Sequence, residues 1–215
     1  MKIHQRLFWF LILLLPVQLG RHFWPASSYL LGIRIDYLAP TVYLTDLLLL
    51  AILILWGAEK IRARKKITFP YLKYGWVLAF LILLFLNAFL AQNQTAAFYK
   101  LIKIIEFSLL GFYLAQNKFS LNFYQKPLLA AVIYSSLLAL AQFLSQSSLG
   151  GPFWWLGERT FDLSTPGIAK AVFSGQLLLR PYATFSHPNA LAGFILVALI
   201  ILVPTGWLRL RAVKR

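Results

Sequence analysis

Apolar runs close to the length of a membrane span recur along this chain. A helix needs ~20 consecutive apolar residues to cross a bilayer, and the runs that approach this length are residues 7–24, 40–57, 74–91, 97–115, 127–145 and 188–207. Hydrophobic residues make up 60% of the 215 residues, and charged residues only 13%. The sequence therefore predicts an all-α integral membrane protein with about six transmembrane helices, organised as one membrane domain over residues 1–215.

The first run has two interpretations. Lys2 and Arg6 resemble the basic beginning of a signal peptide, and residues 7–15 resemble its apolar centre. No small-residue cleavage site follows, and the next segment is itself apolar. These features favour an uncleaved span over a cleaved signal peptide, and whether this span serves as a signal anchor stays open.

The excess of basic residues predicts an orientation. The chain holds 21 Lys and Arg but only 6 Asp and Glu. In a soluble domain this excess would indicate nucleic-acid binding, but in a membrane protein it accumulates in cytoplasmic loops. Most of the basic residues lie inside if both termini are cytoplasmic, which places segment 146–187 outside as one longer, partly ordered loop. We therefore expect a multi-pass protein of the cytoplasmic (inner) membrane, with membrane lipids and no nucleic acid as partners.

Ionisable groups interrupt two of the predicted spans. Lys100, Lys103 and Glu106 recur at intervals of three in "AAFYKLIKIIEF" and so share one helix face. They form either a cationic wall that holds an anionic head group, or a pair of lysines that reach the interface with Glu106 neutralising Lys103. Asp46, in the second run, is expected to pair with an arginine or to be solvated.

The outer segment 146–187 is the one long polar stretch of the chain. Loops of this length in compact proteins are usually functional or disordered, and its Leu and aromatic residues favour order. Its charged side chains are Glu158, Arg159, Asp162, Lys170 and Arg180.

The last run begins with polar residues in "LRPYATFSHPNALAGF". Pro188 suits the first helical position, and Ser186 or His187 can cap the free backbone amides. A helix N-terminus favours anions, and Arg180 lies within reach with a planar guanidinium that suits phosphate. The sequence therefore predicts an anion site here, with His187 as a cap or a supporting ring.

These residues resemble a known family. "GERTF...STPGIAK" followed by "LRPYATFSHPNALAGF" is similar to the bacterial O-antigen ligase and O-antigen polymerase family of multispanning envelope proteins. Ala183 replaces a frequent Gly, and His187 is a common variant. The matching positions are Arg180, Thr184, Phe185, Pro188 and Asn189.

The resemblance implies a glycosyl transfer without metal or cofactor at the outer face of the cytoplasmic membrane. The donor would be a glycan on undecaprenyl diphosphate, and the acceptor a hydroxyl of another glycan, a lipid or a protein. Such a site must bind and stabilise a diphosphate leaving group and deprotonate the acceptor. By this resemblance Arg180 holds the diphosphate, and Arg159, Lys100 and Lys103 are candidates to assist.

Length is the mismatch with that family. Its members have about twice as many spans and a later outer loop that carries the His proposed as the base. His187 does not occupy that later position, so the base is expected outside this sequence. We therefore expect residues 1–215 to be the N-terminal part of a longer protein and to be inactive alone.

Three alternatives stay open. The chain can be a polysaccharide polymerase rather than a ligase of the same family. It can be a lipid-glycan transporter in which Lys100, Lys103 and Glu106 line a path, although no inverted repeat is visible. It can also be a non-enzymatic membrane partner that docks through the basic segment 58–73.

Overall fold

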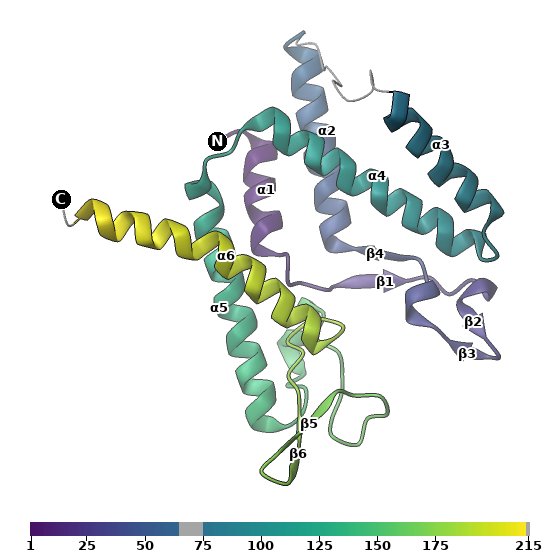
Figure 1. The fold of residues 1–215 in the computed structure, drawn as a ribbon, viewed down its shortest axis with the longest axis vertical. Coiled ribbons are helices and arrows are strands. Elements are labelled where there is room, and N and C mark those ends of the chain that lie inside the picture. Colours follow the sequence, from purple (N-terminus) through teal and green to yellow (C-terminus); the bar gives the residue numbers. More distant parts are fainter. Residues whose placement is uncertain (65–74, 214–215) are drawn as a thin grey trace. The chain divides into compact units, whose positions relative to one another are not determined.

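The computed structural model describes the backbone of residues 1–64 and 75–213, and the side chains of residues 1–64 and 75–203. Residues 65–73 of the basic segment, and residue 74 of the third predicted span, lie outside the described residues. The helices, shown in Figure 1, are α1 (Ile3–Leu13), α2 (Leu44–Arg62), α3 (Gly75–Leu90), α4 (Gln94–Asn117), α5 (Leu121–Ser145) and α6 (Pro188–Val213).

Short strands and 3-10 turns occupy the connections. The antiparallel pair β2–β3 aligns Tyr29 with Arg34, and β5–β6 aligns Lys170 with Leu179. The strands, which pair as β1–β4, β2–β3 and β5–β6, are β1 (Gly20–His22), β2 (Tyr29–Leu30), β3 (Ile33–Arg34), β4 (Thr41–Tyr43), β5 (Lys170–Phe173) and β6 (Gln176–Leu179). The 3-10 turns are η1 (Ala26–Ser28), η2 (Asp36–Leu38) and η4 (Gly151–Leu156).

The prediction of an all-α protein with about six spans is wrong. Within the described residues one helix, α5, is long and apolar enough to cross a membrane. Three other apolar helical stretches, Ile3–Leu13, Gly75–Leu90 and Pro188–Val203, are shorter. The small sheets also contradict an all-α fold.

Short sequence features explain why several of the predicted runs do not form membrane spans. The run predicted over 7–24 stops as a helix at Leu13, shortly before Pro16, and its last part forms β1. The run predicted over 40–57 begins as strand β4, and its helix ends in the charged sequence Glu59–Arg62. Helix α4 carries Lys100, Lys103 and Glu106, and these three charges make it too polar to cross a membrane by composition.

The chain divides into two compact units, each described here by itself. The first unit comprises Met1–His4, Arg21–Val42 and the described part of Asp46–Lys118. The second unit comprises Gln5–Gly20, Tyr43–Thr45 and the described part of Phe119–Arg215.

Helix α4 carries buried contacts of the first unit. Tyr113 is fully buried, receives an edge contact from Trp56 of α2 at 5.7 Å, and shares a hydrogen bond of 2.8 Å with Nδ1 of His4. At its other end the Asn93 side chain caps α4 by accepting from the Ala96 N–H at 3.0 Å. The same side chain donates to the Ser27 carbonyl at 2.7 Å, which ties η1 to this end of the helix.

Helices α5 and α6 pack together in the second unit. The buried residues Leu138 and Ala139 of α5 meet Leu191 of α6 and Ala183 of the preceding segment. The hairpin β5–β6 lies near the C-terminal end of α5 (Figure 1), and there the Gln146 side chain accepts a hydrogen bond from the Leu179 N–H at 2.7 Å. This packing fixes the segment that leads into α6.

Candidate anion-binding site

A buried glutamine positions the segment before α6. Gln142 lies on the inward face of α5 with no exposed surface. Its side-chain oxygen accepts from the N–H groups of Tyr182 at 3.1 Å and Ala183 at 2.7 Å, and its amide donates to the Ala183 carbonyl at 2.9 Å. One side chain therefore satisfies the backbone of a tight bend that would otherwise be buried without partners.

The same glutamine holds a buried carboxylate. Gln142 donates to Glu158 Oε1 at 2.7 Å, and Glu158 also accepts from the N–H groups of Leu149 at 2.9 Å and Gly150 at 2.7 Å. Glu158 is 3% exposed. These bonds occupy both carboxylate oxygens, so Glu158 acts as a support of the segment 146–187. Sequence reasoning missed Gln142, although a glutamine on the same helix face as Leu138 and Ser135 is a signal that it faces protein.

The bend places Thr184 and Phe185 inside the unit. Thr184 is 1% exposed, and its hydroxyl donates to the Pro16 carbonyl. The Phe185 ring packs against Phe194 of α6 at 5.5 Å. Both residues shape the approach to the helix and present no free polar group to a ligand.

The N-terminus of α6 brings together four of the predicted site residues. Pro188 is the first helical residue, and the His187 ring caps the helix by accepting from the Asn189 N–H at Nδ1, 3.1 Å away. This bond requires an unprotonated Nδ1. Arg180 Nη2 donates to Asn189 Oδ1 at 2.8 Å, which aims the guanidinium at the helix end.

Arg180 keeps most of its donors available. Its backbone N–H bonds to the Ala169 carbonyl at 3.0 Å, so the residue is held from both ends. Among the described residues the guanidinium has no carboxylate partner within 4.0 Å, and its other N–H groups have no hydrogen-bond partner there. A half-buried, oriented guanidinium with free donors is suited to bidentate binding of a phosphate.

Arg159 and Asp162 lie on the surface of the same segment. Arg159 is exposed and follows the buried Glu158 directly. Asp162 forms a local turn by accepting from Ser164 N at 2.8 Å, Ser164 Oγ at 2.6 Å and Thr165 Oγ1 at 3.1 Å. Its backbone pairs with Ser147 as an isolated bridge, so the turn closes the base of the segment.

The Asp162 turn predicts a pH dependence. The side-chain and backbone hydrogen bonds from Ser164, with that from Thr165, lower the pKa of Asp162 below its ordinary 3.8. A lowered carboxyl pKa contributes stability above the unfolded value, and this is lost as the pH falls through the folded value. We expect the thermal midpoint of the Asp162→Asn variant to lie below that of the wild type near neutral pH and to converge with it as the pH falls below the ordinary carboxyl value of 3.8 and through the folded value. A difference that does not shrink as the pH is lowered below 3.8 would contradict this assignment.

The lysines of the first unit have different surroundings. Lys103 forms ion pairs with Asp46 and with Glu106 Oε2, the latter at 3.1 Å, so Asp46 pairs with a lysine rather than with an arginine. Lys100 has no ion-pair or hydrogen-bond partner among the described residues, and it lines a cavity between α3 and α4. The two lysines therefore do not act as one cationic wall.

Comparison of the chain with family models, with curated proteins and with solved structures gives no match. The described residues contain no cluster of three or more His, Asp or Glu side chains that could hold a metal ion.

Proposed function

We propose that this chain binds a glycan linked to undecaprenyl diphosphate at the cytoplasmic membrane and takes part in its transfer to an acceptor hydroxyl. The acceptor would be a hydroxyl on a glycan, a lipid or a protein. The activity is that of the O-antigen ligase and polymerase family, which the segment from Arg180 to Asn189 resembles.

One observation carries the proposal: Arg180 is fixed by Asn189 at the N-terminus of α6 while its remaining N–H groups stay available. A diphosphate leaving group carries several negative charges, and a planar guanidinium held in place at the positive end of a helix dipole binds it with little reorganisation. His187 and Pro188 begin the helix at that point. The chemistry assigned to this site is binding and charge stabilisation of the departing diphosphate.

Arg159 is the second candidate for this site. It belongs to the same unit and the same segment as Arg180, and it is exposed. In the proposed complex it would contact the outer phosphate or the first sugar. Removing it should weaken binding less than removing Arg180, because the bond from Arg180 to Asn189 aims the Arg180 guanidinium at the helix end.

We expect Arg180→Ala to lower the affinity of the full chain for undecaprenyl diphosphate by about tenfold or more, since a charge-assisted bidentate contact contributes ~1.5–3 kcal/mol. Arg180→Lys should recover only part of this loss, because a lysine supplies a point charge without the planar pair of donors. The measurement is lipid titration of the full chain in detergent micelles, with undecaprenyl monophosphate as the second ligand.

The matched control is Arg6→Ala, which removes an exposed arginine from the same unit. It should bind undecaprenyl diphosphate as the wild type does. If Arg180→Ala also keeps wild-type affinity and the preference for diphosphate over monophosphate, Arg180 is not the diphosphate ligand and the proposed function fails.

A further inference from the structure

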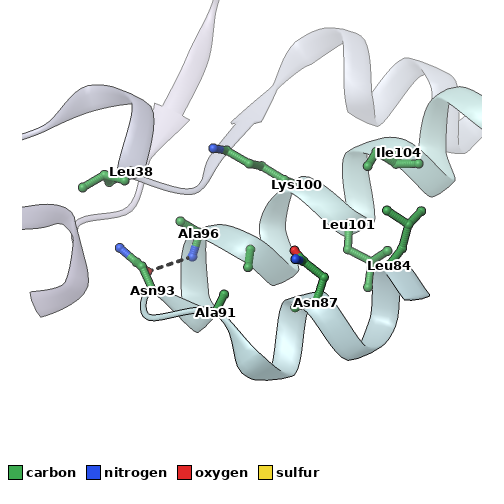
Figure 2. A pocket seen from close by; sticks show the side chains of 11 residues that line it. Leu38, Leu84, Asn87, Ala91, Asn93, Ala96, Lys100, Leu101 and Ile104 are labelled. Carbon is green, nitrogen blue, oxygen red and sulfur yellow. Dashed lines mark hydrogen bonds between the residues drawn. The ribbon is translucent and has the colours of Figure 1, made fainter. Parts of the chain in front are cut away.

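An open cavity lies between helices α3 and α4 in the first unit, and the proposed function does not use it. Its volume is about 400 Å³, within the usual range for sites that hold small organic ligands. Figure 2 shows the side chains that line it, which are Leu38, Leu84, Asn87, Ala88, Ala91, Asn93, Ala96, Ala97, Lys100, Leu101 and Ile104. All of these belong to the first unit.

Small side chains create the space. Ala88 of α3 and Ala96 of α4 are buried, and Ala91 and Ala97 are half-buried beside them. Leu84, Leu101 and Ile104 form the apolar side of the cavity, and in Figure 2 they gather at the end away from Leu38. An apolar wall of this kind suits a hydrocarbon chain.

Some polar groups of the cavity already have hydrogen-bond partners in the protein, and others can still bind a ligand. The Asn93 side chain already has partners, since it accepts from the Ala96 N–H as the cap of α4 and donates to the Ser27 carbonyl. The Lys100 ammonium and the Asn87 side-chain amide have no partner among the described residues, and both are exposed. Lys100 extends toward the side of Leu38 in Figure 2, so the one available cation of the cavity is separate from its apolar side.

The surface of α3 decides between a soluble anion and a lipid. This helix exposes large apolar side chains along its whole length, among them Trp76, Phe80, Leu83, Phe89 and Leu90. Leu90 is 84% exposed. A helix that is apolar on all sides needs protein or lipid around it, so the cavity opens beside a surface that favours acyl chains.

We propose that this cavity binds an anionic phospholipid. One acyl chain lies against Leu84, Leu101 and Ile104, and the phosphate bonds to Lys100, with Asn87 as an additional donor. Lys103 does not serve this role because Asp46 and Glu106 already neutralise it. The site is independent of Arg180, which belongs to the second unit.

The test measures lipid binding by the full chain in detergent micelles, by native mass spectrometry. Dioleoylphosphatidylglycerol should bind about fivefold more tightly than dioleoylphosphatidylcholine, as expected for one lysine at an anionic head group. Lys100→Gln should remove this preference, and it should weaken the choline lipid much less, because the phosphate of that lipid is already neutralised by its own ammonium group. Lys118→Gln, which changes an exposed lysine at the end of α4, should keep the preference.

A second variant tests the chain-binding part of the cavity. Ala97→Phe fills the space between the helices and should weaken both lipids by a similar factor. Glycerol 3-phosphate, which has the head-group phosphate without acyl chains, should not displace phosphatidylglycerol, and Arg180→Ala should not change the lipid preference. The proposal is overturned if Lys100→Gln keeps the preference, if Ala97→Phe binds lipid as the wild type does, or if glycerol 3-phosphate competes.

Discussion

Replacing Gln142 with Leu is expected to lower the free energy of unfolding by about 4 kcal/mol, because it leaves several buried groups without partners. The N–H groups of Tyr182 and Ala183 lose their acceptor, and the Glu158 carboxylate loses a donor. Each orphaned buried group costs ~1–3 kcal/mol. Leucine has nearly the same volume as glutamine, so the loss comes from hydrogen bonding rather than from a cavity.

Denaturant titration of the full chain in micelles measures this loss. Gln125→Leu is the matched control, since it makes the same change on the same helix at a half-buried glutamine whose side chain has no hydrogen-bond partner among the described residues. It should change stability by less than about 0.5 kcal/mol. Equal stabilities of Gln142→Leu and Gln125→Leu would show that the buried network around Gln142 is not formed.

The same variant connects the fold to the proposed site. Gln142 fixes Ala183, and Ala183 lies three residues after Arg180 and five residues before Pro188. Loosening this bend separates the guanidinium from the helix end that it faces. Gln142→Leu should therefore also weaken binding of undecaprenyl diphosphate, whereas Gln125→Leu should not.

The apolar runs predicted where most of the helices lie, but they did not predict which of these helices can span a membrane. The run predicted over 127–145 ends where α5 ends, and the run over 74–91 nearly coincides with α3. An apolar run predicts a helix because a backbone away from water must form its own hydrogen bonds. This holds whether protein or lipid surrounds the helix. The step from apolar runs to six spans failed because helix length and internal charges also matter, as α1 and α4 show.

Of the small sheets, the β1–β4 pair could not be predicted from the sequence, whereas the β5–β6 hairpin could have been. Strands β1 and β4 each have three residues and lie about twenty positions apart, so no alternation of polar and apolar residues is long enough to be recognised. Strands β5 and β6 are joined by Ser174 and Gly175, which both adopt positive φ, 50° and 78°. A Ser-Gly turn is a hairpin signal, and it was available in the sequence.

Part of the candidate site could be predicted because several of its residues lie close together in the sequence. Arg180, His187, Pro188 and Asn189 are close in sequence, so their proximity follows from a short chain length. The supports Gln142, Glu158 and Pro16 come from distant positions, and only the fold brings them together. Ala183 has φ 50°, a conformation that glycine adopts most easily, and this explains physically why a glycine would suit the position.

Gly157→Ala is the second change with a large expected effect. Gly157 has φ +88°, and a Cβ there would lie 2.4 Å from the carbonyl carbon of Gln18. The two backbone segments cannot move apart freely, because the Gln18 N–H donates to the Leu156 carbonyl at 3.1 Å. Backbone strain of ~1–3 kcal/mol and overpacking of ~1–3 kcal/mol should together lower stability by about 3 kcal/mol.

Two other glycines of the second unit serve as controls that distinguish the cost of backbone strain from the cost of the steric clash with Gln18. Gly167 and Gly175 also have positive φ, +74° and +78°, but a Cβ at either position meets nothing within 4 Å. Gly167→Ala and Gly175→Ala should therefore each lose only about 1 kcal/mol, from strain alone. Denaturant titration of the three variants isolates the contact with Gln18 as the difference. If Gly157→Ala loses no more than the two controls, the close approach of residues 18 and 157 is absent, and the segment 146–187 is not held against Pro16–Gln18 as described.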